Sequence, residues 1–291
     1  MNTPEKVDAV DSQRKDQPEY SRRSFFKQAT LVGATTAVAI GGFAGLASAL
    51  DKPRLTGGQQ TRKPASNGLE QGDIDILVAA EIAEALAVTT YSNIIHLAPF
   101  FKRLQADDKG YLRAARNEEM SHYALEQSAT GQDSPFTTFY YPFHMFEDTQ
   151  TTLNTLVTLE DAFIAAYLVG VRNFSTPDLR VTAARIMGIE SDHRTLARVI
   201  GPGVAARDGG PIEQITGAQG VAESVDPPNN NGYERTLCWT DISQAVNALL
   251  PFVDVDSARK AGFDTSKSYD FEPFKPKLPI GLGEFISFTG C

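Results

Sequence analysis

The feature that most constrains this chain is a glutamate placed inside each of four otherwise apolar helical patterns. Apolar residues recur at steps of three and four, which predicts four amphipathic helices. The helices are expected at about residues 73–103, 111–128, 147–174 and 177–200. Their stripes contain, in chain order, Glu84, Glu119, Glu160 and Glu190. Because a carboxylate in an apolar core is unfavourable unless it is paired or bound to a metal, the four helices are predicted to surround shared charged groups.

Two of these helices carry a histidine three residues after the glutamate. The pairs are Glu119 with His122 and Glu190 with His193. Positions i and i+3 lie on one face of an α-helix, so both side chains of a pair can bind one ion. The chain has only four histidines, and finding two of them in such pairs favours a metal site. A polar core without metal is the alternative.

The chain repeats this arrangement at constant offsets. A Glu-x6-Tyr pattern occurs twice, 76 residues apart (160 − 84), and the Glu-x-x-His pattern occurs twice, 71 residues apart (190 − 119). The first pattern consists of Glu84 with Tyr91 and of Glu160 with Tyr167. Equal offsets predict two similar helical hairpins related by a pseudo-twofold axis, each supplying half of the ligands.

The charges of such a site balance. Two divalent cations carry a charge of +4, which offsets the −4 of the four glutamates, and imidazole with carboxylate suits iron or manganese, although zinc is also compatible. Tyr91 and Tyr167 are the candidate catalytic residues, because their hydroxyls are able to hydrogen-bond ligand carboxylates or to carry redox equivalents. Filling the core with an anchored hydroxyl is the simpler alternative for each.

Three further glutamates lie near the predicted ligands. Glu81 and Glu84 both face inward, and Glu84 is preferred because Tyr91 follows it by seven residues, as Tyr167 follows Glu160. Glu118 is a candidate for orienting a histidine and Glu126 for an accessory ligand, with a solvated helix face as the alternative for either. The remaining histidines, His96 and His144, fit no ligand spacing.

The N-terminal segment has the features of an export signal. Residues 21–27, SRRSFFK, resemble the twin-arginine (Tat) export motif, and a weakly apolar stretch follows that ends in Ala47-Ser48-Ala49. Residues 1–49 are therefore predicted to be a Tat signal peptide, with a retained membrane anchor as the alternative. The Tat export machinery would be a partner and the location periplasmic or otherwise exported. Residues 50–71 read as a linker.

The remaining segments are less regular. Residues 130–146 are aromatic and contain two prolines, which predicts a long crossover between the hairpins. Residues 202–291 are rich in glycine, proline and asparagine and contain one expected helix at 241–250, so they are predicted to wrap the bundle of residues 72–201 as an irregular extension. Cys238 and Cys291 are either one disulfide or two thiols.

Composition excludes several classes of function. The net charge is −9, and no cluster of basic residues outside the N-terminus indicates nucleic-acid binding. Two cysteines are too few for a cysteine-rich zinc or iron–sulfur site. No glycine-rich phosphate loop or Ser/His/Asp order is present.

The motifs of residues 72–201 resemble those of the exported ferritin-like family, related to bacterioferritin, rubrerythrin and manganese catalase. The resemblance implies an all-α fold, a four-helix bundle of two hairpins with a long crossover, and a centre of two iron ions or of manganese. The residues that match the family's ligand positions are Glu84, Glu119, His122, Glu160, Glu190 and His193, with Glu119 and Glu190 bridging.

The same resemblance implies an oxidoreductase, ferroxidase- or peroxidase-like, acting on O2, peroxide or Fe(II). A manganese-catalase-like peroxide disproportionase and a non-catalytic, metal-stabilised envelope protein that binds a partner are the alternatives. The long C-terminal extension argues against a closed storage cage, and the two cysteines exclude a four-cysteine iron site. The pattern leaves the oligomeric state open, a homodimer included.

Overall fold

The protein is described by a computed structural model over residues 69–200 and 237–277. The predicted signal peptide, most of the predicted linker and residues 201–236 lie outside the described residues, as does Cys291. The export and disulfide predictions therefore remain predictions.

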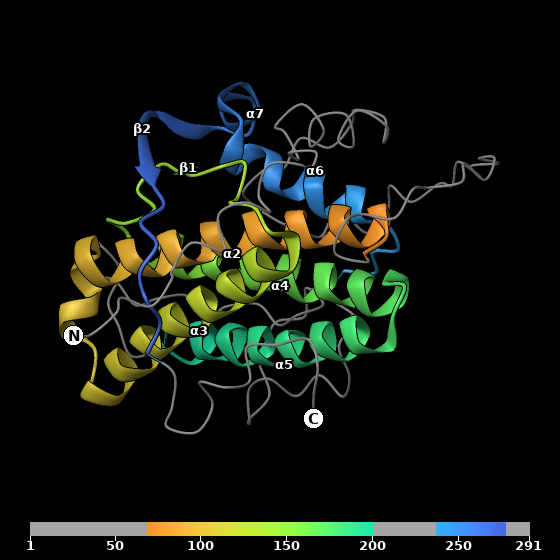
Figure 1. Cartoon of the computed structure of the whole chain (residues 1–291). Coiled ribbons are helices and arrows are strands. Elements are labelled where there is room, and N and C mark those ends of the chain that lie inside the picture. The colour runs from red at the N-terminus through yellow and green to blue at the C-terminus, as the bar shows by residue number, and fades with distance from the viewer. Residues whose placement is uncertain (1–68, 201–236, 278–291) are drawn as a thin grey trace, which may run out of the picture.

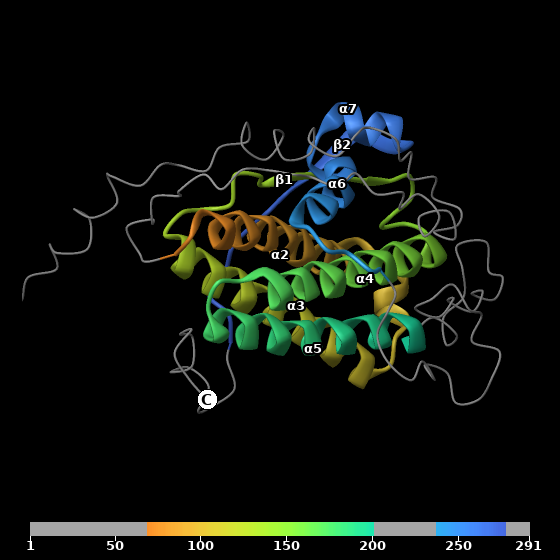
Figure 2. The same cartoon turned by 90° about the vertical axis from the view of Figure 1, so that its right-hand side faces the viewer.

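Four long helices form the bundle that the sequence predicts (Figures 1 and 2). They are α2 (Gln71–Leu97), α3 (Ala106–Thr130), α4 (Thr149–Asn173) and α5 (Pro177–Ile200). α2 packs against α3 and α4 packs against α5, so each consecutive pair is a helical hairpin, and the hairpins meet chiefly where α2 faces α4. The prediction of an all-α fold with two hairpins is confirmed.

The ends of two helices differ from the sequence prediction. α2 stops at Leu97, and residues Pro99–Arg103 form a separate 3-10 helix, η3, instead of a kinked continuation. A proline has no N–H to donate and disfavours the helical conformation at the residue before it, and Ala98 is indeed extended. α3 begins at Ala106, inside the expected turn, with Asp107 and Asp108 at the positive end of its dipole.

The crossover and the C-terminal extension meet in a two-stranded antiparallel ribbon. Strand β1 (Thr138–Pro142) pairs with β2 (Phe263–Asp270), so that Phe139 lies opposite Tyr269 and Pro142 lies opposite Phe263. α6 (Ile242–Val253), near the helix expected at 241–250, packs against α2, α4 and β1, and the short α7 (Val255–Lys260) packs against α6 and the ribbon on the side away from the bundle. The crossover is therefore less irregular than its prolines suggest.

α2 is the most enclosed helix because α6 covers part of the face that the other helices leave open. Every residue from Ile76 to Tyr91 is buried, including Thr89 and Thr90, whose hydroxyls donate to carbonyls one turn earlier in the helix. α4 is long and apolar enough to cross a membrane, but most of that stretch is buried against the bundle and contains Glu160. It is the core partner of α2.

Candidate metal centre

The six side chains predicted as ligands converge in the middle of the bundle. α2 supplies Glu84, α3 supplies Glu119 and His122, α4 supplies Glu160, and α5 supplies Glu190 and His193. The four glutamates are at most 1% exposed, His193 is 3% exposed and His122 is 9% exposed. Six polar side chains thus meet in a region that is almost closed to solvent.

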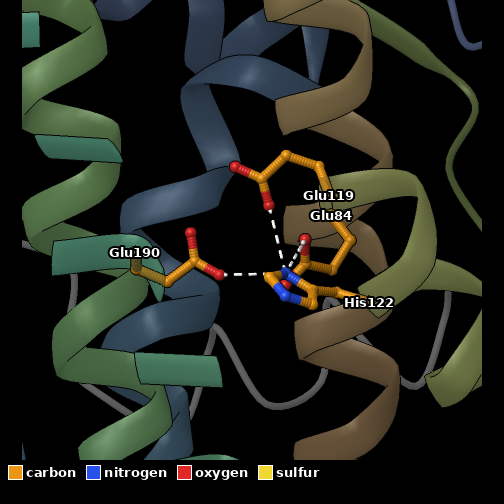
Figure 3. A group of neighbouring side chains, drawn as sticks. All are labelled: Glu84, Glu119, His122 and Glu190. Carbon is orange, nitrogen blue, oxygen red and sulfur yellow. Dashed lines mark ion pairs between the residues drawn. The ribbon is translucent and has the colours of Figure 1, made fainter. Parts of the chain in front are cut away.

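One cluster surrounds the Nδ1 atom of His122 (Figure 3). This nitrogen lies 3.2 Å from Glu190 Oε1, 3.4 Å from Glu119 Oε2 and 3.5 Å from Glu84 Oε2. One ligand atom from each of these four residues lies within 4.8 Å of all the others. That spacing fits a single ion held by three carboxylates and an imidazole.

A second cluster surrounds the Nδ1 atom of His193. It lies 2.9 Å from Glu119 Oε1 and 3.3 Å from Glu190 Oε2, and Glu160 completes a group whose ligand atoms again lie within 4.8 Å of one another. Glu119 and Glu190 belong to both clusters. The arrangement is therefore compatible with a dinuclear site in which these two carboxylates face both ions.

Many of the oxygens in the two clusters have no hydrogen-bond donor among the described residues. They include Glu84 Oε2, both oxygens of Glu119, Glu160 Oε2 and Glu190 Oε1. Among the described residues, His122 Nδ1 likewise has no hydrogen-bond partner. A buried polar atom without a partner costs free energy, and a buried charge costs more. Metal cations would supply the missing partners, so the donor set fits a metal centre.

The same crowding shifts the pKa values of these groups. Burial, reinforced by the other glutamates, raises the pKa of Glu84 and of Glu160 well above the usual range. Burial also opposes the charged form of Glu119, but the charge of His193 and the close approach of the His122 imidazole outweigh it and hold the pKa of Glu119 low. Without metal, these side chains must share protons instead.

Two tyrosines tie the hairpins together at the centre. Tyr91 of α2 donates to Glu160 Oε1 of α4 at 2.6 Å, and Tyr167 of α4 hydrogen-bonds Glu84 Oε1 of α2 in the reverse direction. Tyr167 is also 2.6 Å from Glu126 Oε1. One hydroxyl has one proton, so a protonated Glu126 must donate to Tyr167 when Tyr167 donates to Glu84. Each tyrosine thereby orients a carboxylate from the opposite hairpin.

The structure also places the side chains whose roles the sequence left open. Glu118, whose side chain is 47% exposed, lies 2.9 Å from His193 Nε2, so it orients the imidazole whose Nδ1 faces the cluster. Glu84 belongs to a ligand cluster and Glu81 to neither. His96 is exposed, and His144 contacts Glu147 on the surface at 3.0 Å. Neither lies at the centre.

Two buried carboxylates are poorly anticipated by the sequence. Glu81 is fully buried and Glu126 is 1% exposed. Burial, followed by repulsion from Glu126, raises the pKa of Glu81 to about 9, and burial raises that of Glu126 to about 8. Helical spacing predicted an inward position for Glu81 and left a solvated face open for Glu126, because spacing does not distinguish a partly exposed position from a fully buried one.

A small apolar pocket borders the centre on the side of Tyr167. Its walls come from the four long helices and the start of α6 and include Leu77, Leu179 and Ile242. Apart from Thr182, its polar side chains are those of Tyr167 and Glu126. Such a pocket accommodates small uncharged molecules next to a residue that contacts Glu84.

Comparison with known proteins agrees with this geometry. Residues 72–200 match a family described as a ferritin-like domain, a range that covers all four bundle helices and all six clustered side chains. No curated protein and no solved structure matches the chain.

Proposed function

We propose that this ferritin-like domain holds two redox-active metal ions and acts as an oxidoreductase on O2, peroxide or Fe(II). The observation that carries the proposal is the overlap of the two ligand clusters through Glu119 and Glu190. Two independent surface sites would not share carboxylates. Shared carboxylates between two histidine-containing groups are what a coupled pair of ions requires.

In this proposal each ion has one histidine and one carboxylate of its own. Glu84 and His122 serve the first ion, and Glu160 and His193 serve the second. Glu119 and Glu190, which belong to both groups, would hold both ions. The four carboxylates offset the charge of two divalent cations, so the loaded core is neutral where the empty core must take up protons.

The chemistry that iron or manganese supplies here is the binding and polarisation of an O–O bond while the metals change oxidation state. The chain's own residues prepare the place for it. Tyr91 and Tyr167 hold Glu160 and Glu84, and Glu118 fixes the imidazole of His193. The apolar pocket beside Tyr167 would hold a small uncharged molecule next to a residue that contacts Glu84, and its apolar walls exclude bulk water.

The mixed oxygen and nitrogen donors favour iron or manganese, and zinc would also fit. We place the protein outside the cytoplasm because residues 21–27 resemble the Tat motif. Tat substrates are exported folded, so the metals would be inserted in the cytoplasm before export. That order lets the cell control which metal is offered.

The test is oxidation of Fe(II) by the metal-free full chain under air. Wild type is expected to oxidise added Fe(II) faster than buffer, and Glu119→Ala/His122→Ala is expected to fall to the buffer rate. A matched control is His144→Ala/Glu147→Ala, which removes an exposed histidine–glutamate pair of the same spacing. The control should behave as wild type. Loss of Fe(II) oxidation in the control would contradict the proposal. So would oxidation at the wild-type rate in Glu119→Ala/His122→Ala.

A further inference from the structure

Two buried carboxylates lie beside the dinuclear clusters without belonging to them. Glu81 lies one turn before Glu84 on α2, and Glu126 lies one turn after His122 on α3. They are 0% and 1% exposed, as enclosed as the predicted ligands themselves. Their position at the packed interface of α2 and α3 needs an explanation of its own.

Glu126 acts on the charge of Glu81, and each of the two side chains has few hydrogen-bond partners. Glu126 is the charged neighbour that acts most strongly on Glu81, followed by Asp133. The hydroxyl of Thr130 is 3.4 Å from Glu81 Oε2, a long contact, and Tyr167 hydrogen-bonds Glu126 Oε1 at 2.6 Å. The other two oxygens, Glu81 Oε1 and Glu126 Oε2, have no hydrogen-bond partner within the described part of the chain.

The second hairpin shows that the fold does not require carboxylates at these positions. The 76-residue offset that relates Glu84 to Glu160 carries Glu81 to Val157 (81 + 76), which is 6% exposed. The 71-residue offset that relates Glu119 to Glu190 carries Glu126 to Ala197 (126 + 71), which is 0% exposed. An apolar pair fills the equivalent space, so the two glutamates cost stability that packing alone does not recover.

We propose that Glu81 and Glu126 bind a third divalent cation, beside the dinuclear centre and separate from it. One divalent cation offsets the charge of two carboxylates and gives the two unpartnered oxygens an ion to bind. All of the donors are oxygen, with the hydroxyl of Thr130 at the edge, so the site suits ions such as Mn2+, Fe2+ or Mg2+ better than it suits zinc. Tyr167 joins Glu126 to Glu84 and so places this cation next to the pair.

The test counts Mn2+ bound to the metal-free full chain by equilibrium dialysis, with free Mn2+ measured by electron paramagnetic resonance. Wild type is expected to bind three ions and Glu81→Gln/Glu126→Gln two. Glu147→Gln, an exposed carboxylate changed in the same way, should still bind three. Circular dichroism checks that each variant keeps its helices, which isosteric amides should preserve. Equal numbers bound by wild type and the Glu81/Glu126 variant would overturn the proposal.

A further variant separates this proposal from that of the dinuclear centre. Glu119→Ala/His122→Ala is expected to keep one Mn2+, and adding Glu81→Gln/Glu126→Gln to it should remove that last ion. Two ions in both wild type and the Glu81/Glu126 variant would leave the pair intact and eliminate the third site. One ion in wild type, lost on changing Glu81 and Glu126, would support the third site and contradict the pair.

The location can be tested in crystals soaked in Mn2+. An anomalous difference peak between Glu81 and Glu126, absent from Glu81→Gln/Glu126→Gln, is the expected result. Peaks at the clusters of His122 and His193 alone, at a concentration that saturates binding in solution, would contradict the assignment.

Discussion

The two hairpins of this bundle are nearly equivalent at the predicted dinuclear centre and differ immediately around it. α2 with α3 and α4 with α5 each supply one Glu-x6-Tyr pattern and one Glu-x-x-His pattern. The contacts of the two tyrosines follow the same symmetry: Tyr91 contacts Glu160 and Tyr167 contacts Glu84. Residues that obey the symmetry are those that two equivalent ions would need.

Three of the differences are carboxylates of the first hairpin. Glu118 contacts His193, whereas the residue at the equivalent position of α5 (118 + 71) is Ile189, which has no carboxylate to orient His122. Glu81 and Glu126 likewise have apolar counterparts in the second hairpin. One half of the bundle therefore carries the additions that orient, protonate or extend the centre. The asymmetry separates what the metal pair requires from what adjusts it.

The largest expected effect comes from removing a shared carboxylate instead of an unshared one. Glu190→Ala should abolish binding of both ions, because Glu190 belongs to both clusters. Glu84→Ala and Glu160→Ala should each weaken the binding of one ion more than the binding of the other. Metal content per chain after dialysis distinguishes these outcomes. Similar losses in all three variants would mean that the ligands do not divide into shared and unshared sets.

A smaller effect is expected from Glu118, which breaks the symmetry at the histidines. Glu118→Ala frees the imidazole of His193 and should weaken the second ion by about 10- to 100-fold, as for other residues that orient metal ligands. The affinity for the first ion, next to His122, should stay nearly unchanged. Competition with a chelator measures both affinities. Equal weakening of the two ions would show that Glu118 acts on the bundle as a whole.

The buried pair of the first hairpin predicts a pH dependence of the metal-free protein. The pKa of Glu81 is about 9 and that of Glu126 about 8, against 4.5 for a free glutamate. The folded state therefore keeps protons that the unfolded chain releases, and the free energy of unfolding should fall as the pH rises from about 5 to 8. Each such group contributes a slope of up to about 1.4 kcal/mol per pH unit.

Glu81→Gln is expected to flatten this slope and to stabilise the metal-free protein at pH 8. Urea unfolding at several pH values in the presence of a chelator measures both effects. Glu147→Gln, on the surface, serves as the control. An unchanged slope in Glu81→Gln would show that Glu81 is not the group that binds the proton.

The smallest effects should distinguish the two tyrosines. Tyr91→Phe and Tyr167→Phe each remove a buried hydrogen bond, worth about 1 kcal/mol of unfolding free energy. Tyr167 contacts two carboxylates and Tyr91 one, so Tyr167→Phe should cost more and should slow Fe(II) oxidation more. Equal effects would contradict a special role for Glu126. Unfolding and oxidation rates of both variants provide the comparison.

Local periodicity predicted the four helices because each hairpin has a clear apolar stripe, and the Glu-x-x-His spacing predicted which side chains meet. The structure brings those six side chains together. Periodicity did not predict that β1 pairs with β2, since residues about 130 positions apart must meet, as Thr138 meets Asp270. It also missed how completely Glu81 is buried, because burial depends on the packing of neighbouring helices, which the spacing within α2 does not describe.

The most direct test of the account is the metal content of the protein purified from its own envelope fraction, measured by mass spectrometry. Glu119→Ala/His122→Ala and the surface control His144→Ala/Glu147→Ala would be purified beside it. The account predicts at least two iron or manganese ions per chain in wild type and control, and loss of the pair in the centre variant. Wild type without metal, or with no more than the centre variant, would contradict the dinuclear centre.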